Sequence, residues 1–309
     1  MTDAPPEKDI HSTAPAAPPS SRRPGSIQHD AWQALRRFTP ARIALGRAGQ
    51  SLPTRALLEF GVAQAQARDA VFQASQQAAL LAQLSAHGYE ALGVASAASD
   101  RQQYLRRPDL GRRLASSSRE RLEQWAAAAP AGVTPDLVLV VADGLSAQAA
   151  ARHALPLLRL LGPLLTGWQL GPVVVADMAR VALGDEIGAI LRARQVAVLI
   201  GERPGLSAPD SLGIYLTHEP RPGRTDAERN CISNIRPEGL AYDAAARRLR
   251  YLLAGALRLG RTGVDLKDES RDSGPEEERA IEASPDASAA ALTGAPAPPA
   301  PAVPLSPGR

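Results

Sequence analysis

Cysteine and aromatic residues are scarce in this chain. The 309 residues include one cysteine, Cys231, and aromatic residues make up only 4%. A single cysteine excludes an internal disulfide and a zinc site built from several cysteines, and it fits a reducing cytoplasm. With so few aromatic rings, a hydrophobic core must consist mainly of alanine, leucine and valine. Apolar residues form 44% of the chain, which is enough for one large domain or two ordinary ones.

The chain also lacks a strong excess of charge and a long apolar run. The formal net charge is +3, and we expect no nucleic-acid partner, because neutralising phosphates requires a concentrated basic face. No apolar run approaches the roughly 20 residues that cross a bilayer. The polar, proline-bearing start MTDAPPEKDI is not a secretory signal, so we expect no membrane partner either.

Both ends of the chain are poor in large apolar residues. Residues 1–29 are rich in proline, serine, alanine and charge, and residues 268–309 are acidic and then rich in proline and alanine. Such segments cannot bury enough apolar surface to offset the entropy lost on ordering. Both are therefore predicted to be disordered tails. For residues 1–29, a role in recruitment or solubility remains an alternative to a plain tail.

Helical patterns dominate residues 30–130. Apolar residues recur at helical spacing from Trp32 to Phe72, and alanine-rich helical stretches follow over residues 75–87 and 116–129. The loop GRAGQS, residues 46–51, carries a basic residue and could meet a phosphate. It lacks the preceding strand of a phosphate-binding loop, so a capped turn between helices is favoured.

Residues 131–267 alternate between apolar runs and helical patterns. The runs 136–142, 172–176 and 196–200 are short and continuously apolar, as buried parallel strands are. Helices are predicted between them, including residues 184–194, and a final helix is predicted over residues 242–259. The sequence thus predicts an α/β fold, with a Rossmann-like, mostly parallel sheet flanked by helices, preceded by a helical N-terminal region.

Right-handed crossovers would bring the carboxyl ends of these strands to one edge of the sheet, with Ser146, Val181 and Glu202 close to it. The turn GERPG, residues 201–205, follows the third run, and its glycines let a ligand approach the backbone closely. Open α/β sheets bind ligands beyond this edge. Glu202 either pairs with a nearby arginine, Arg203 or Arg221, or accepts a hydrogen bond from a ligand.

Cys231 ends the polar loop that follows. A nucleophilic role would require a base beside it, for which His218 is the plausible candidate, whereas a lone cysteine is more often a small packing residue. The chain has neither a GxGxxG nor a GxxxxGK[ST] motif, and none of its five histidines lies in an Asp-x-His-x-x-Gly pattern. From the residues alone, we would interpret the chain as a stand-alone Rossmann-like nucleotide-binding regulatory module.

Four arginines fall within the ten residues YLRRPDLGRR, residues 104–113. Two interpretations are equally open for them. They are a solvated loop with internal ion pairs to Asp109, or they are a surface for a large acidic partner subunit.

Several long blocks of this sequence resemble the small (light) subunit of ethanolamine ammonia-lyase. The blocks are GERPGLSAPDSLGIYLTHEP with ERNCISNIRPEG, TPARIALGRAGQSLPTRALLEFGVAQAQARDAVF, YLRRPDLGRRL, VVADGLSA and RVALGDEIG. They occur in the right order across residues 32–265. Long ordered blocks are far more specific than one short motif.

The resemblance implies a non-catalytic subunit of a carbon–nitrogen lyase. In this family, ethanolamine is converted to acetaldehyde and ammonia by radical chemistry that belongs to adenosylcobalamin. A large barrel subunit binds the substrate and forms a hetero-oligomer with the small subunit, which closes the corrinoid site at their interface. The cofactor keeps its own base as the lower ligand, the base-on form. The location, free in the cytoplasm or inside a bacterial microcompartment, is left open.

The resemblance also assigns roles along the chain. Residues 30–130 are implied to be a helical region that packs on the large subunit, and residues 131–267 an α/β domain that covers the cofactor. Val181, Glu202 and Cys231 are implied to contact the corrinoid, because they stand in the matching blocks. No catalytic acid, base or nucleophile is expected in this chain.

Overall fold

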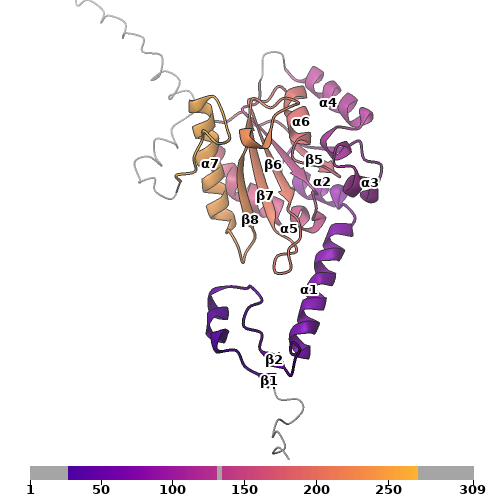
Figure 1. The fold of residues 1–309 in the computed structure, drawn as a ribbon. Helices are drawn as coiled ribbons and strands as arrows, with labels where there is room; N and C mark the ends of the chain where they lie inside the picture. Colours follow the sequence, from indigo (N-terminus) through magenta and orange to yellow (C-terminus); the bar gives the residue numbers. More distant parts are fainter. Residues whose placement is uncertain (1–26, 131–133, 271–309) are drawn as a thin grey trace, which may run out of the picture. The chain divides into compact units, whose positions relative to one another are not determined.

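A computed structural model describes residues 27–130 and 134–270 (Figure 1). The chain divides into two units, residues 1–62 and 63–309. The predicted disordered tails, residues 1–29 and 268–309, fall mostly outside the described residues, so their disorder stays a prediction.

The first unit is described from Ile27 onward. It contains a short antiparallel pair, β1 (Ile27–Gln28) with β2 (Arg47–Ala48), and a 3₁₀ helix, η1 (Ala31–Phe38). The Asp30 side chain caps η1 by accepting a hydrogen bond from the Trp32 N–H at 2.8 Å. The segment GRAGQS forms β2 and a turn in which the Ala48 N–H donates to the Ser51 carbonyl. Helix α1 (Thr54–Phe72) begins in this unit and ends in the next.

A six-stranded sheet forms the centre of the second unit within residues 63–130 and 134–270. Its strand order is β3-β5-β4-β6-β7-β8. The first four strands are parallel, and β7 and β8 are antiparallel to their neighbours. The strands are β3 (Ala91–Ala95), β4 (Leu137–Ala142), β5 (Val173–Asp177), β6 (Gln195–Gly201), β7 (Leu212–His218) and β8 (Asn230–Ile235). The predicted α/β fold with a mostly parallel sheet is confirmed.

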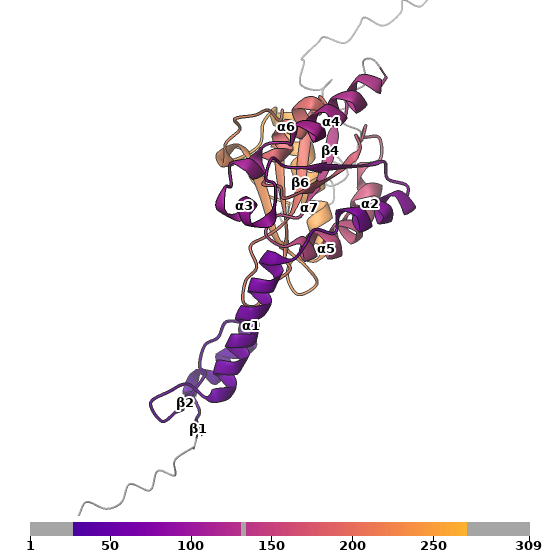
Figure 2. The same cartoon turned by 90° about the vertical axis from the view of Figure 1, so that its right-hand side faces the viewer.

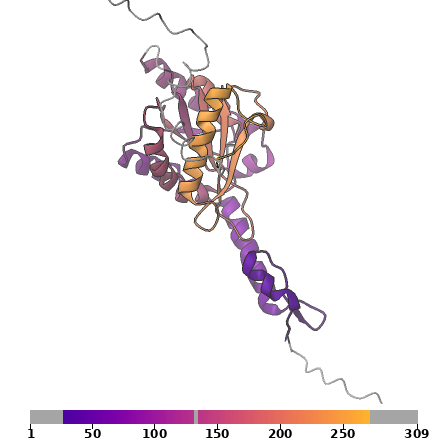
Figure 3. The ribbon, with the colours of Figure 1, turned by 90° about the vertical axis from the view of Figure 1, so that its left-hand side faces the viewer.

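Helices cover both faces of this sheet (Figures 2 and 3). One face packs against α2 (Gln77–Ala86), α5 (Ala147–Leu161) and α7 (Tyr242–Leu259). The other face packs against α4 (Ser116–Ala128) and α6 (Leu183–Ile190). The shorter helices are α3 (Arg101–Arg106), η2 (Leu110–Arg112), η3 (Gly162–Leu165) and η4 (Asp226–Glu228). No helix in the described ranges is both long and apolar enough to cross a membrane.

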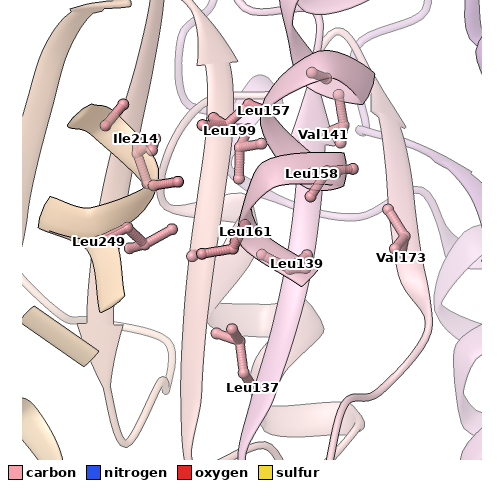
Figure 4. Packing of buried hydrophobic residues seen from close by; sticks show 14 of the residues in the cluster. Leu137, Leu139, Val141, Leu157, Leu158, Leu161, Val173, Leu199, Ile214 and Leu249 are labelled. Carbon is pink, nitrogen blue, oxygen red and sulfur yellow. The ribbon is translucent and has the colours of Figure 1, made fainter. Parts of the chain in front are cut away.

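Aliphatic side chains fill the larger of the two core layers (Figure 4). Leu157, Leu158 and Leu161 of α5 are fully buried beside Leu139 of β4 and Leu199 of β6. Continuously apolar strands are buried on both faces, as expected for parallel strands between helical layers. This packing fixes where the carboxyl ends of the strands lie.

Three local features differ from the sequence-based expectations. Strand β3 lies in the stretch 30–130, which was predicted to be helical; its sequence ALGVA buries only Val94, so its strand signal is weak. Helix α6 ends at Ile190 and not near Arg194, because Arg192 adopts a left-handed backbone with φ of 55°. Cys231 lies within β8 and not at the end of a loop, since it pairs with Tyr215 of β7.

Candidate functional site

The carboxyl ends of β4, β5 and β6 lie side by side. The Asp143 N–H donates to the Ala176 carbonyl of β5, and the Leu145 N–H donates to the Gly201 carbonyl of β6. Gly144 has φ of 55°, and a Cβ at this position would overlap the Gly201 carbonyl. The turns after β4 and β6 are therefore packed backbone against backbone at this edge, which requires glycine.

An ion pair fills the crevice between β4 and β5. In open α/β sheets, ligands bind where neighbouring strands send their connections to opposite faces, and β4 and β5 are such a pair here. Arg101 contacts Asp143 at 3.0 Å and also donates to the Gly144 carbonyl at 2.9 Å. Asp143 in turn accepts a hydrogen bond from the Ala179 N–H at 3.1 Å. Burial raises the pKa of the Asp143 carboxyl to about 6, against the lowering effect of Arg101.

The amino end of α5 is also occupied by the protein itself. The Ser146 hydroxyl accepts a weak hydrogen bond from the Ala149 N–H and donates to the Pro209 carbonyl at 3.1 Å. A nucleotide phosphate would need this helix end or the neighbouring crevice. Both places are filled by side chains of the chain, so the geometry does not favour a nucleotide-binding module.

Glu202 lies directly after β6, in the turn that leads to β7. Its N–H donates to the Ser211 carbonyl at 3.0 Å, and its carboxylate accepts from the Asn234 N–H at 3.2 Å. Gly213 makes room for this side chain, because a Cβ there would lie 2.8 Å from Oε1 of Glu202. Among the described residues the Glu202 carboxylate forms no ion pair with Arg203 or any other basic residue. It keeps unused acceptor capacity toward solvent.

Cys231 and Tyr215 face each other on the paired strands β8 and β7. Burial, together with the nearby Cys231 and Glu202, raises the pKa of Tyr215 to about 12. Partial shielding from water also raises the pKa of the Cys231 thiol, and Glu202 adds to this effect. The thiol is therefore neutral near neutral pH, which disfavours a nucleophilic role.

His218 does not complete a nucleophilic pair with Cys231. It lies three residues beyond Tyr215 on β7, so its side chain points to the opposite face of the sheet from Tyr215 and Cys231. The structure therefore places no histidine base beside Cys231, which lies exposed on β8.

The turn that carries Glu202 is held in place by contacts with α5, which in turn contacts α7. Asp210 forms an ion pair with Arg152 of α5 and lies 3.7 Å from Nε2 of His153 on the same helix. The His153 ring is in turn hydrogen-bonded to the Tyr242 hydroxyl of α7 at 2.7 Å. These contacts hold the carboxylate of Glu202 on a supported loop.

Val181 precedes α6 and lines a cavity of about 1000 Å³. The cavity lies between the segment after α3, the start of α6 and the connection from β7 to β8. Neither Glu202 nor Cys231 lines this cavity. Val181 and Tyr215 nevertheless pack against the same core layer, which places Val181 on the sheet face that carries Cys231. The structure thus brings Glu202 and Cys231 together around Tyr215 and places Val181 on the same face.

Comparison with known proteins decides the family. The family model described as ethanolamine ammonia-lyase light chain (EutC) matches residues 29–267. The chain belongs to this family.

Three relatives named ethanolamine ammonia-lyase small subunit show how close the similarity is. The protein from Ralstonia nicotianae is 57% identical over 79% of this chain and 91% of its own length. That from Pseudomonas fluorescens is 57% identical over 78% of this chain and 88% of its own length. That from Azotobacter vinelandii is 56% identical over 81% of this chain and 92% of its own length. The resemblance drawn from sequence blocks is confirmed, and the name of these lyase subunits implies a larger partner.

Two features of the site were missed by sequence reasoning. Tyr215 connects Glu202 and Cys231, and the only signal for it was a lone aromatic residue in an otherwise aliphatic strand, LGIYLTH. The Arg101–Asp143 pair joins residues 42 positions apart and leaves no local pattern.

Proposed function

We propose that this chain is the small subunit of an adenosylcobalamin-dependent ethanolamine ammonia-lyase. It helps to enclose the corrinoid at the interface with the catalytic large subunit and supplies no catalytic acid, base or nucleophile of its own. The observation that carries the proposal is the Glu202 carboxylate, which is held on a braced turn without an ion-pair partner among the described residues, beside Cys231 and Tyr215.

The donor and acceptor chemistry of this face fits a corrinoid. Amide side chains surround a corrin ring, and a fixed carboxylate such as Glu202 is a strong acceptor for their N–H groups. Tyr215 and Cys231 offer a partly apolar surface at the β7–β8 side of the sheet, and Val181 offers an apolar contact on the same face. When bound, adenosylcobalamin supplies radical chemistry through homolysis of its cobalt–carbon bond. The chain lacks the Asp-x-His-x-x-Gly pattern, which supports the base-on form.

The first unit supports a hetero-oligomer with the large subunit. Trp32, Phe38 and Leu58 are 68%, 72% and 64% exposed, and η1 buries none of its residues. Clusters of exposed large apolar side chains mark protein interfaces. We assign them to packing on the large subunit, as proposed for residues 30–130, while residues 131–267 cover the cofactor. A cytoplasmic location, free or within a bacterial microcompartment, fits a chain with one cysteine.

Calorimetry with two ligands tests the proposal against a nucleotide-binding role. Adenosylcobalamin and ATP are each titrated into the chain alone and into its mixture with the large subunit. We expect strong corrinoid binding in the mixture, weak or no corrinoid binding by the chain alone, and no ATP binding in either sample. Tight ATP binding by the isolated chain would overturn the proposal.

A further inference from the structure

The cavity beside Val181 is rich in arginine. Among the described residues its lining includes six arginines and four carboxylates. The arginines are Arg112, Arg113, Arg119, Arg180, Arg224 and Arg229, and the carboxylates are Asp109, Asp185, Glu186 and Asp226. The balance of these charges depends on which of them are already paired.

The carboxylates of α6 neutralise two of the arginines. Asp185 accepts two hydrogen bonds from Arg229, at 2.6 and 2.7 Å, in a buried bidentate pair. Glu186 forms an ion pair with Arg119 and accepts a hydrogen bond from the Leu114 N–H at 2.9 Å. These contacts attach both walls of the cavity to the first turn of α6.

The other carboxylates near the cavity also lie close to arginines. Asp226 lies 3.6 Å from the Arg229 side chain, and Arg224 pairs with Glu228 at 2.6 Å. Asp109 pairs with Arg107 at 2.7 Å and also feels the charge of Arg113. The internal pairing expected for the YLRRPDLGRR stretch therefore holds for Arg107 and does not extend to Arg112.

Three arginines of the cavity have no ion-pair partner in the part of the chain that the structure describes: Arg112, Arg113 and Arg180. Arg180 stacks on the Tyr104 ring at 4.3 Å and donates one long hydrogen bond from Nη2 to the Tyr104 carbonyl at 3.4 Å. Its Nε is buried without a hydrogen-bond acceptor among those residues. Stacking orients a guanidinium and leaves its edge free for an anion.

The backbone holds these arginines in one place. The Arg180 N–H donates to the Gly111 carbonyl at 2.8 Å. A Cβ on Gly111 would lie 2.9 Å from Cγ of Arg180 and 2.9 Å from the Tyr104 ring, so glycine permits this close approach. The backbone that precedes Arg112 and Arg113 is thereby held against Arg180, although the two segments are far apart in sequence and both of these side chains are exposed. With the backbone already fixed, only the arginine side chains remain to be ordered when an anion binds.

We propose that Arg112, Arg113 and Arg180 form a phosphate-binding site, and that its ligand is the phosphodiester in the nucleotide tail of the corrinoid. The inference rests on the proposed function, because it requires a corrinoid on the face that carries Val181. A phosphodiester has one negative charge and two free oxygens, which match the paired N–H donors of arginine. The corrin ring is surrounded by neutral amides and gives this cluster no comparable anion.

A pair of corrinoids separates the phosphate contact from the rest of the cofactor. Adenosylcobalamin has the phosphodiester, and adenosylcobinamide lacks the phosphate together with the ribose and base. Both are titrated by equilibrium dialysis into the full complex of small and large subunits. The test variant is Arg112→Gln with Arg113→Gln. The matched control is Arg159→Gln with Arg258→Gln, which removes the same charge from exposed positions on α5 and α7 at the other sheet face.

We expect the test variant to weaken adenosylcobalamin binding about tenfold or more and to change adenosylcobinamide binding less than about twofold. The control should change neither. Arg180→Lys, which keeps the charge but not the fork, should weaken adenosylcobalamin binding to an intermediate degree. An equal loss with both corrinoids would overturn the inference, as would loss of subunit association in size-exclusion chromatography, which would mean that the cavity binds acidic side chains of the partner.

Failure of the proposed function gives a different result. In that case the wild-type complex binds neither corrinoid. If the wild-type complex binds both and the test variant discriminates no better than the control, only the phosphate assignment is wrong.

Discussion

Glu202 is a charged residue that is held in place without an ion-pair partner among the described residues. Its carboxylate accepts one backbone hydrogen bond from Asn234, and Gly213 leaves space beside it. The contact between Asp210 and His153 of α5 helps to fix the turn that carries Glu202. A carboxylate that forms no ion pair keeps its acceptor strength for a ligand amide.

Replacing Glu202 therefore tests the cofactor contact. In the complex with the large subunit, Glu202→Ala should weaken adenosylcobalamin binding by about 1.5–3 kcal/mol, the range for hydrogen bonds to charged groups. Glu202→Gln keeps the shape of the side chain and loses its charge. Its affinity for adenosylcobalamin should lie between those of Glu202→Ala and the wild type. Glu123→Gln on the exposed side of α4 is the control and should bind like wild type. Unchanged affinity in Glu202→Ala would exclude the contact.

Arg101 and Asp143 make a prediction about pH. Burial raises the pKa of Asp143 from its ordinary value of 3.8 to about 6 in the folded chain. Since the folded state binds this proton more tightly, stability falls as pH rises from about 4 to about 6. Arg101 lowers the pKa of Asp143 in the folded chain. Arg101→Met should therefore raise this pKa, so that stability continues to fall above about pH 6.

Urea denaturation of the full chain measures this effect. Arg101→Met should lower the free energy of unfolding by about 3–5 kcal/mol near pH 8, where the buried carboxylate is uncompensated, and by less near pH 5. Adding Asp143→Asn should remove the pH dependence of the difference. A deficit that is the same at both pH values would show that Asp143 is not the titrating group.

At the scale of elements, the apolar runs were enough to predict β4, β5 and β6, because buried parallel strands are continuously apolar. The final helix was predicted with the bounds it has, Tyr242–Leu259. Strand β3 was missed because four of its five residues are only partly buried. The placement of Cys231 in β8 was missed since edge strands mix polar and apolar residues and resemble loops.

Helix α5 provides a test of the packing at this scale. Leu157 is fully buried against β4 and β6, whereas Leu160 on the same helix is 44% exposed. Leu157→Ala should lower the free energy of unfolding by about 2–5 kcal/mol, because it leaves a cavity in the core. Leu160→Ala should cost less than about 1 kcal/mol. Thermal and urea unfolding of both variants measure the difference, and equal losses would contradict the assigned face.

The candidate site was predictable only in part. Val181, Glu202 and Cys231 were taken from matching sequence blocks, and their roles stay predictions. Spacing alone could not show that Tyr215 joins Glu202 to Cys231, because the link depends on the register of β7 and β8. The sequence singled out Arg112 and Arg113, but not their lack of an ion-pair partner within the described ranges or their position beside Arg180, because both depend on which residues lie nearby in space.

At the scale of the whole molecule, the first unit leaves large apolar side chains exposed to solvent. Most of the large apolar side chains in its described part are exposed, and η1 has no buried residue. A segment of this composition is stabilised when a partner covers it.

Polar replacements in this unit should therefore affect assembly and leave the sheet domain intact. Trp32→Ser with Phe38→Ser should reduce co-purification with the large subunit about tenfold or more, because exposed aromatic residues often anchor interfaces. The circular dichroism and unfolding of the isolated chain should stay close to wild type. Undiminished co-purification would show that the partner binds elsewhere.

Reconstitution of turnover tests the central claim most directly. The chain and the ethanolamine ammonia-lyase large subunit are purified separately, supplied with adenosylcobalamin and ethanolamine, and assayed for acetaldehyde alone and after mixing. We predict no acetaldehyde from this chain alone and restored turnover in the mixture. Acetaldehyde formation by the chain alone, or a mixture no more active than the large subunit by itself, would contradict the account.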